Sequence, residues 1–327
     1  MRSKFTIFSL LLVVLFALDI LLGSEVVDLS AIFSEGSFSH NIIFNFRLPK
    51  ALTAVMAGVA LAVSGLLMQT VFRNPLAGPY ILGVSAGASL GVAIFMLGVP
   101  LLGASVLKDL GVAFSAWAGA AVILVLVMAV SVRIKDIMAV LILGMMFGTA
   151  ASAFVDILQY FSNEAALKGF VIWAMGSLGG LSEVKLAIMA VCVAAGLVMS
   201  LLSTKSLDLL LLGENYARSM GLNVTGTRIL IFAATSLLAG SVTAFCGPIA
   251  FLGIAVPHMA RMIFRRADHR VLLPASILIG ADLMLLCDII AGVPGYDLVL
   301  PINTITSLFG IPVVIMVVIN SKRGKVM

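Results

Sequence analysis

Residues 47 to 91 carry the clearest structural signal in the sequence. This stretch begins Arg47-Leu-Pro-Lys50, continues with a long apolar run, reverses at Phe72-Arg-Asn-Pro-Leu-Ala-Gly-Pro79, and resumes as Leu82-Gly-Val-Ser-Ala-Gly-Ala88. An apolar run of about 20 residues crosses the hydrocarbon core of a bilayer as a helix. The stretch therefore predicts one membrane-spanning helix, a tight Pro/Gly reversal, and a second helix with a glycine face.

The composition excludes a soluble domain. Of the 327 residues, 62% are hydrophobic and 11% are charged, and the mean hydropathy is +1.21. The core of a globular domain grows more slowly than its chain and does not need so much apolar surface. The net charge of +5 comes from basic residues in short connections, which indicates membrane topology better than nucleic-acid binding.

Hydropathy predicts an all-α membrane protein with about ten transmembrane helices in a single polytopic domain, residues 1–327. Residues 161–185 and 204–226 are read as the longest polar connections. The first span is expected to be a retained helix, with a cleavable signal peptide as the alternative. The predicted spans are 5–22, 48–72, 80–98, 111–132, 137–160, 186–203, 227–247, a short one at 254–264, 271–291 and 303–320.

Charge predicts the orientation of these spans. If the N-terminus is cytoplasmic, fifteen basic residues fall in inner connections and five in outer ones. This positive-inside bias supports an even number of spans with both termini in the cytoplasm.

Small residues recur at helical spacing in the second and third spans. Such residues let membrane helices approach closely, so these positions are expected to serve close helix packing or to line a translocation path. They are Gly58, Ala62 and Gly65 on one face, and Gly83, Gly87 and Gly91 on another. Residues 75–77 with 82–84 also resemble residues 248–250 with 252–254, at opposite ends of the expected topology, which favours inverted repeats.

Residues 206–224 form an amphipathic segment on the predicted cytoplasmic side. Gly213 and Gly221 are expected to bracket one or two short helices. An isolated helix this short is marginal in water, so it should dock on another surface. The groove of a partner protein is the preferred interpretation, and a helix lying on lipid is the alternative. Its expected apolar face, beside Glu214 and Arg218, consists of Leu209, Leu212, Tyr216 and Met220.

Residues typical of catalysis or metal binding are sparse. The sequence has no glycine-rich loop followed by Lys-Ser/Thr, no CxxC and no HExxH, so we expect no cofactor or metal bound by this chain. The three cysteines lie far apart in apolar runs, which is typical of packed side chains. His258 has no second ligand at metal-binding spacing and is expected to be structural. No nucleophile–base set indicates an enzyme.

Three carboxylates, Asp156, Asp282 and Asp288, fall within or near spans. Intramembrane carboxylates are costly and often functional. We expect Asp282 to hydrogen-bond between helices. A proton-coupled carrier would also use such a group, so a stand-alone ion-coupled secondary transporter remains the alternative function.

Taken in order, several motifs resemble those of the FecCD/BtuC-type permeases, the membrane subunits of ABC importers for iron-siderophores, haem and corrinoids such as vitamin B12. The resemblance covers nearly the whole chain. The motifs are Arg47-Leu-Pro-Lys50, Asn74-Pro-Leu-Ala77 with Leu82-Gly-Val-Ser85, Gly213-Glu214 with Gly221, Phe251-Leu-Gly with Val256-Pro-His258 and Arg261, Asp268-His-Arg270 with Leu273-Pro274, and Leu300-Pro-Ile302 with Gly310-Ile-Pro312.

The resemblance implies a BtuC-like type II importer fold in the bacterial inner membrane, with no catalytic residues of its own. It implies a homodimer with a translocation path at the dimer axis, two ATP-binding-cassette subunits on the cytoplasmic side that hydrolyse ATP, and a periplasmic or lipoprotein binding protein on the other side. Residues 206–224 match the family's coupling helices and are called the coupling segment below. The family resemblance does not identify the substrate.

Arg47 and Lys50 match outer-face basic residues that pair with carboxylates of the binding protein in the family. Capping of the second span at the lipid headgroups is the alternative role. The family usually has arginine where this chain has Lys50, which loses bidentate geometry. Many members also carry a basic residue shortly after the aspartate that matches Asp288, whereas this chain has Ile-Ile-Ala-Gly292.

Overall fold

Helix α3 (Leu48–Val71) lies at the centre of the structure. The structure is a computed structural model that describes residues 1–23, 37–98, 108–134, 136–292 and 299–322. From Ala57 to Val71 every residue of α3 is buried, and all but Gln69 carry apolar or small side chains. A helix that is apolar all round must be enclosed by other helices. Accordingly, α14, α12, α13 and α9 pack around it.

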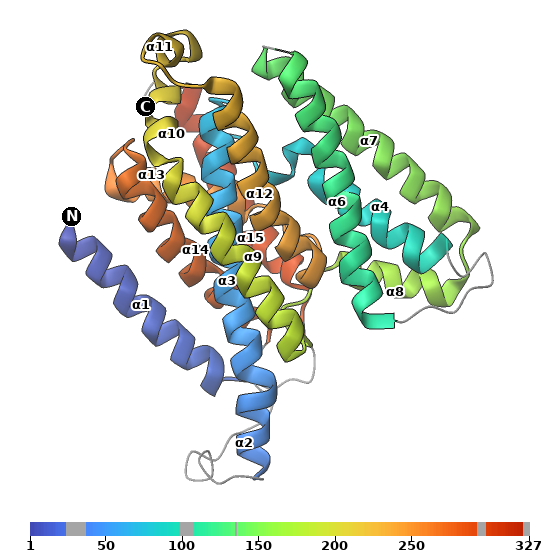
Figure 1. The fold of residues 1–327 in the computed structure, drawn as a ribbon. Coiled ribbons are helices and arrows are strands. Elements are labelled where there is room, and N and C mark those ends of the chain that lie inside the picture. The colour runs from blue at the N-terminus through green and yellow to red at the C-terminus, as the bar shows by residue number, and fades with distance from the viewer. Residues whose placement is uncertain (24–36, 99–107, 135, 293–298, 323–327) are drawn as a thin grey trace.

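The helices form two groups that meet at α12 (Figure 1). One group contains α1 (Arg2–Leu21), α3, α9 (Glu183–Leu202), α13 (Leu252–Phe264), α14 (His269–Ala291) and α15 (Ile302–Lys322). The other contains η3 (Pro79–Leu82), α4 (Val84–Ala93), η4 (Ile94–Gly98), α6 (Lys108–Arg133), α7 (Ile137–Phe161) and α8 (Glu164–Ala174). Helix α12 (Val224–Cys246) packs against α3 and α9 on one side and against α6 and α4 on the other.

The ten predicted spans are confirmed as helices. Within the described residues, seven helices are long and apolar enough to cross a membrane, and three shorter apolar helices cover 84–98, 252–264 and 302–317. The short ones coincide with Pro/Gly-rich turns or with a proline inside the helix, as at Pro257 and Pro312. The chain is therefore a multi-pass membrane protein.

The second span begins ten residues earlier than predicted. Helix α2 (Phe38–Ile42), a π-helical turn η2 (Ile43–Arg47) and α3 run on without a break. Hydropathy placed this start at residue 48, and a proline at position 49 is unfavourable inside a helix because it lacks an amide hydrogen and clashes with the preceding turn. Here the wider π turn immediately before Pro49 accommodates the proline, so the helix continues.

Residues 161–185 are not only a polar connection, as predicted, but contain α8. Asn163 caps this helix by accepting a hydrogen bond from the amide of Ala166, and Glu164 follows in the first turn. An 11-residue helix is too short for a hydropathy window of membrane length. Its cap was the available signal.

The basic ends of several helices gather at one end of the molecule, the upper end in Figure 1. Lys4 at the start of α1 donates to the carbonyl of Ile263, and Phe5 stacks beside Phe264 with ring centroids 4.7 Å apart. The coupling segment lies at this end too (Figure 1). Lys135, Arg323 and Lys325, which entered the charge count, lie outside the described residues.

Candidate functional site

The coupling segment folds as two short helices, α10 (Thr204–Leu211) and α11 (Glu214–Ser219). Gly213 separates them with φ +107°, and Gly221 follows α11 with φ +84°. Side chains other than glycine rarely adopt such angles, so these two glycines allow the sharp turns on either side of α11. Leu207, Leu210 and Ala217 face inward and are buried.

The opposite side of the coupling segment presents large apolar side chains to the outside. Leu212, Tyr216 and Met220 are each more than half exposed, whereas Leu209 of the predicted face is half-buried. Arg218 is exposed beside them. Exposed apolar groups rimmed by charges at the polar end of a membrane protein mark an interaction surface.

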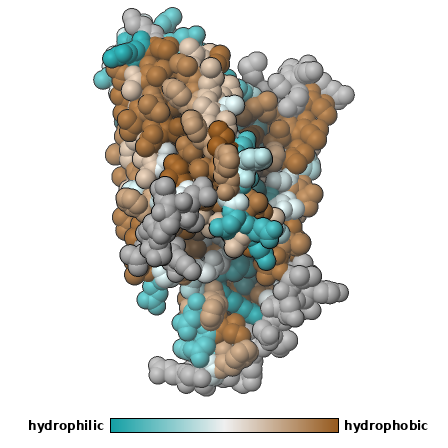
Figure 2. All heavy atoms as spheres, turned by 90° about the vertical axis from the view of Figure 1, so that its right-hand side faces the viewer, coloured by the Kyte–Doolittle hydropathy of each residue, from teal (hydrophilic) through white to brown (hydrophobic). Residues whose placement is uncertain are grey.

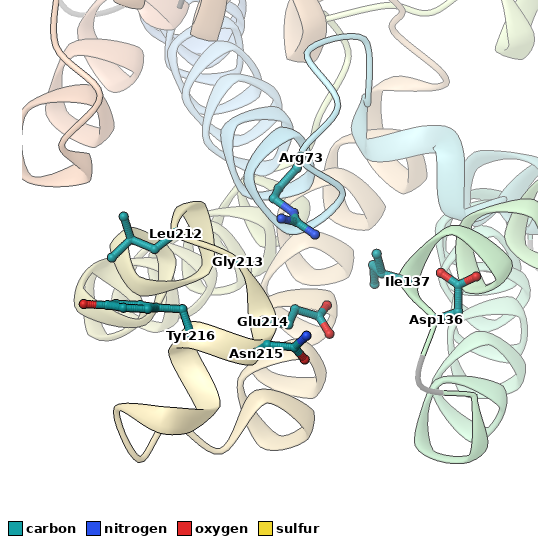
Figure 3. A pocket seen from close by; sticks show the side chains of 8 residues that line it. All are labelled: Arg73, Asp136, Ile137, Leu212, Gly213, Glu214, Asn215 and Tyr216. Atoms are coloured by element: carbon teal, nitrogen blue, oxygen red, sulfur yellow. The ribbon is translucent and has the colours of Figure 1, made fainter.

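An open cleft of about 470 Å³ lies between the turn that joins α10 to α11 and the start of α7 (Figure 3). Glu214 and Asn215 point into the gap toward α7, whereas Leu212 and Tyr216 point the other way (Figure 3). Arg73, at the end of α3, reaches in from above Gly213, and Asp136 lies on the far wall (Figure 3). The cleft therefore lies between the two helix groups, at the end of the molecule that carries the coupling segment, and charges of both signs line it.

Glu214 anchors α11 to the core through an ion pair with Arg228 of α12. The Arg228 side chain is almost completely buried. Its partner faces the cleft. From the sequence, Arg228 was only one of the basic residues that indicate the cytoplasmic side. Its pairing with Glu214 was not predicted, because Glu214 and Arg228 lie on different predicted elements.

The two similar Pro/Gly motifs meet inside the structure. An added Cβ at Gly253 would lie 2.5 Å from Cδ of Pro79, and one at Gly78 would lie 3.1 Å from Cγ1 of Ile254. The amide of Ile249 also donates to the Tyr80 hydroxyl at 3.4 Å. Each motif leads into a short helix, α4 or α13, so the predicted repeat relates two broken spans that touch.

The five glycines assigned to a path or to close packing all lie at close helix contacts. A Cβ added to Gly58 would lie 2.2 Å from the carbonyl oxygen of Gly280. One added to Gly65 would lie 1.7 Å from the carbonyl oxygen of Gly253, and one added to Gly91 would lie 1.9 Å from that of Ser115. Gly87 meets Gly119 of α6 in the same way. Gly83 has φ +74° and abuts Gly144 and Gly148 of α7.

Arg47 and Lys50 are engaged within the chain. Arg47 is only 9% exposed, and its Nη1 donates to the carbonyls of Ile20 and Leu21 at 3.0 and 2.8 Å. It therefore caps the C-terminal end of α1. Lys50 forms an ion pair of 2.9 Å with the buried Asp288 of α14. Docking of a binding protein by these residues stays a prediction.

Removing the Lys50 cation should destabilise the outer end of the α3–α14 contact. Lys50→Ala leaves a buried carboxylate without its partner, at a cost of about 1–3 kcal/mol. Lys50→Met combined with Asp288→Asn removes both charges and should recover most of the loss. Thermal unfolding of the detergent-solubilised protein measures this, and a single variant that melts like wild type would contradict the pairing.

The double variant also separates stability from docking. If the charge of Lys50 steers a binding protein, the double variant should bind it more slowly at low salt, and the difference should shrink as ionic strength rises. Unchanged binding at low ionic strength would place the contact elsewhere on the outer surface.

The remaining polar candidates differ in their surroundings. Asp282 is buried, and within the described part of the chain neither carboxylate oxygen has a hydrogen-bond partner, so the expected bond between helices is not formed there. His258 is also buried, and its ring lies beside the backbone of Pro75. Among the described residues, no three His, Cys, Asp or Glu side chains are grouped so that they could hold a metal ion. Asp156 is exposed on α7.

Helix α7 carries three distinct faces. The residues against α4 and η3 include Gly144 and Gly148, which are buried. A second face is exposed and apolar, with Phe154, Ile157 and Phe161. Helix α7 lies on the right-hand side of Figure 1, and Figure 2, which turns that side toward the viewer, shows hydrophobic residues over much of the surface. A third face, also exposed, carries the i, i+3, i+7 set of Thr149, Ser152 and Asp156.

Comparison with known proteins gives consistent matches over the full length. The FecCD transport family matches residues 11–320. The vitamin B12 import system permease protein BtuC of Vibrio vulnificus is 34% identical over 324 residues, which is 98% of this chain and 95% of that protein. The hemin transport system permease protein HmuU of Yersinia pestis is 34% identical, covering 87% of this chain and 85% of that protein.

Solved structures agree with these matches. A structure described as an inward-facing conformation of a metal-chelate type ABC transporter superimposes with a TM-score of 0.86 at 30% identity, over 98% of this chain and all of that one. PsaBC from Streptococcus pneumoniae in complex with Fab shares the fold, with a TM-score of 0.54 at 15% identity over 85% of this chain and 92% of that one.

Proposed function

The chain belongs to the FecCD transport family of ABC importer permeases, and from this premise we propose that it carries a bulky metal chelate, namely an iron-siderophore, haem or a corrinoid, across the bacterial inner membrane. It is a transport permease and not an enzyme. Two relatives of equal identity are named for vitamin B12 and for hemin. Vitamin B12 and hemin are both large metal-bearing macrocycles.

The observation that carries the proposal is the exposed apolar side of the coupling segment. Leu212, Tyr216 and Met220 stand out at the basic end of the molecule, where lipid tails do not reach if that end faces the cytoplasm. Two ATP-binding-cassette subunits, which hydrolyse the ATP, cover this surface. This chain itself holds no cofactor, and both of its termini lie on the ATPase side.

The translocation path lies between two copies of the chain, along the third face of α7, which carries Thr149, Ser152 and Asp156. An aspartate at the centre of a membrane helix costs about 2.5–3.5 kcal/mol when it faces lipid, and Asp156 lies in the last two turns of α7. Thr149, Ser152 and Asp156 are exposed in one chain, so they face a partner or a water-filled space rather than hydrocarbon. In the homodimer this face lines the space through which the chelate passes, while the apolar face of α7 meets lipid.

A binding protein delivers the chelate to the opposite end of the molecule. Alternating access follows when closure of the ATPase pair moves the coupling segments, and the two broken spans at Pro79 and Gly253 supply a crossing that can repack. An ion-coupled carrier would use a buried group such as Asp282. Such a carrier has no need for an apolar docking surface on its cytoplasmic side.

The experiment is uptake into vesicles that contain this chain, its ATPase subunit and its binding protein. A ferric siderophore, haem and cobalamin are supplied separately, with a metal-free siderophore as the matched control. We expect ATP-dependent uptake of one metal-bearing class and little of the metal-free control. Uptake of none of the three classes, with an amino acid or a simple ion taken up instead, would contradict the proposed substrate class.

A further inference from the structure

Three side chains from three elements form a hydrogen-bonded chain that runs from the half-buried Asp208 in the coupling segment to two buried residues of the core. Asp208 of α10 approaches Nδ1 of His269 at 2.6 Å, and Nε2 of the same ring lies 2.8 Å from the hydroxyl of Thr70. His269 is the first residue of α14, and Thr70 lies in the last turn of α3. Thr70 and His269 are 1% and 0% exposed.

A threonine, histidine and aspartate in this order also resemble a hydrolytic triad. Burial excludes that role. The Thr70 hydroxyl is fully enclosed and also bonds to the carbonyl of Leu66 within its own helix. No substrate can reach an oxygen in that position, so the three residues hold elements together rather than perform chemistry.

The chain attaches α10 to the ends of two core helices at once. The Asp208 carboxylate also accepts the backbone amide of His269 at 3.0 Å, which is one of the free amides at the start of α14. A carboxylate at a helix N-terminus is favoured by the helix dipole. Helix α14 in turn packs on α3 so closely that an added Cβ at Gly58 would lie 2.2 Å from the carbonyl oxygen of Gly280.

Two hydrogen bonds from Asp208 therefore join α10 to His269 of α14. The imidazole ring of His269 extends this link to Thr70 of α3. Helix α11 has its own link, from Glu214 to Arg228 of α12. Polar groups buried this deeply are costly to leave unpaired, because each lost partner costs about 1–3 kcal/mol. A displacement of α10 is thus opposed unless α3 and α14 move with it.

We propose that Asp208, His269 and Thr70 form a clamp that transmits movement of the coupling segment to the α3–α14 pair. The inference rests on the proposed function and adds to it the route by which the movement enters the core. The three are positioning residues that touch neither ATP nor the transported chelate. They join the ATPase-facing end to the Gly58–Gly280 crossing and, along α3, to its crossing with the broken span α13 at Gly65 and Gly253.

The test uses Thr70→Val, which keeps the shape of the side chain and removes its hydroxyl. Thr53→Val is the matched control, because Thr53 lies on the same helix, is equally buried, and bonds only to the Pro49 carbonyl of its own helix in the contacts described. Thr70→Ser restores the hydroxyl, and Asp208→Ala removes the other end of the clamp. The first readout is hydrogen exchange of residues 204–211 in the detergent-solubilised chain alone.

We expect exchange in α10 to rise about tenfold in Thr70→Val and Asp208→Ala, and to stay at the wild-type level in Thr53→Val and Thr70→Ser. The second readout is chelate transported per ATP hydrolysed in the assembled importer. It should fall at least about fivefold in the first two variants and not in the other two. A merely structural role would lower the melting temperature without changing this ratio.

Either of two results overturns the clamp. One is unchanged exchange in α10, which would mean that the three residues do not hold it. The other is raised exchange with an unchanged ratio of transport to hydrolysis, which would mean that the contact transmits nothing. The proposed function has a separate readout, ATP-dependent chelate uptake by the assembled wild-type importer, so its failure is distinguishable from failure of the clamp.

Discussion

Replacing Tyr216 with Asp is expected to disrupt assembly with the ATPase subunit. Tyr216 is 53% exposed at the tip of the coupling segment, and buried aromatic anchors typically contribute the most to an interface. Loss of one such anchor weakens binding by about 2–4 kcal/mol, or about 30- to 1,000-fold in Kd. Met220→Asp should act in the same direction. The fold should survive, since both side chains point away from the core.

Co-purification of the ATPase subunit and its transport-coupled activity measure this effect. The matched control is Val299→Asp, which places the same charge on an apolar residue that is 70% exposed beyond the opposite end of α14. Retention of the ATPase by both coupling-segment variants at wild-type levels would remove the docking assignment. The charge distribution would then be the remaining support for placing this end of the molecule in the cytoplasm.

Gly65→Ala is expected to prevent stable folding. The added Cβ would lie 1.7 Å from the carbonyl oxygen of Gly253, and backbone cannot move aside as a flexible side chain can. Overpacking of a core costs about 1–3 kcal/mol when side chains can adjust, so more than about 3 kcal/mol is expected here. Little monodisperse protein should be recovered from membranes.

Gly240→Ala is the matched control for this substitution. Gly240 is a buried glycine within α12, and an added Cβ there meets nothing within 4 Å among the described residues. Alanine also has the higher helix propensity, by about 1 kcal/mol. The Gly240 variant should therefore melt at or above the wild-type temperature. Equal yields and melting temperatures for the two variants would contradict the close crossing of α3 and α13.

The spans could be predicted from the sequence because the bilayer imposes a length and a composition on each one. The glycine faces of α3 and α4 were also visible, since the helical period fixes which residues share a face. Their partners were not, because nothing local says that Gly65 meets Gly253. Helix α8 was not predicted, because it is too short and too amphipathic for a signal that depends on membrane-length apolar runs.

The polar contacts were the least predictable part. Arg47 and Lys50 stand at the expected mouth of a span, where exposed charges are common. The structure shows that α1 and α14 supply their partners, Ile20, Leu21 and Asp288. Asp208, His269 and Thr70 likewise come from three elements far apart in sequence. Such contacts depend on tertiary packing, for which one sequence carries no local pattern.

The energy source of chelate uptake by reconstituted vesicles separates an ATP-driven importer from an ion-coupled carrier. The chain is assembled with its ATPase subunit and binding protein, and uptake is followed with ATP and with its non-hydrolysable analogue, while proton and sodium gradients are collapsed by ionophores. We expect uptake that needs hydrolysable ATP and the ATPase subunit and that continues when the proton and sodium gradients are collapsed. Uptake by the chain alone, driven by an ion gradient and abolished by Asp282→Asn, would contradict this expectation.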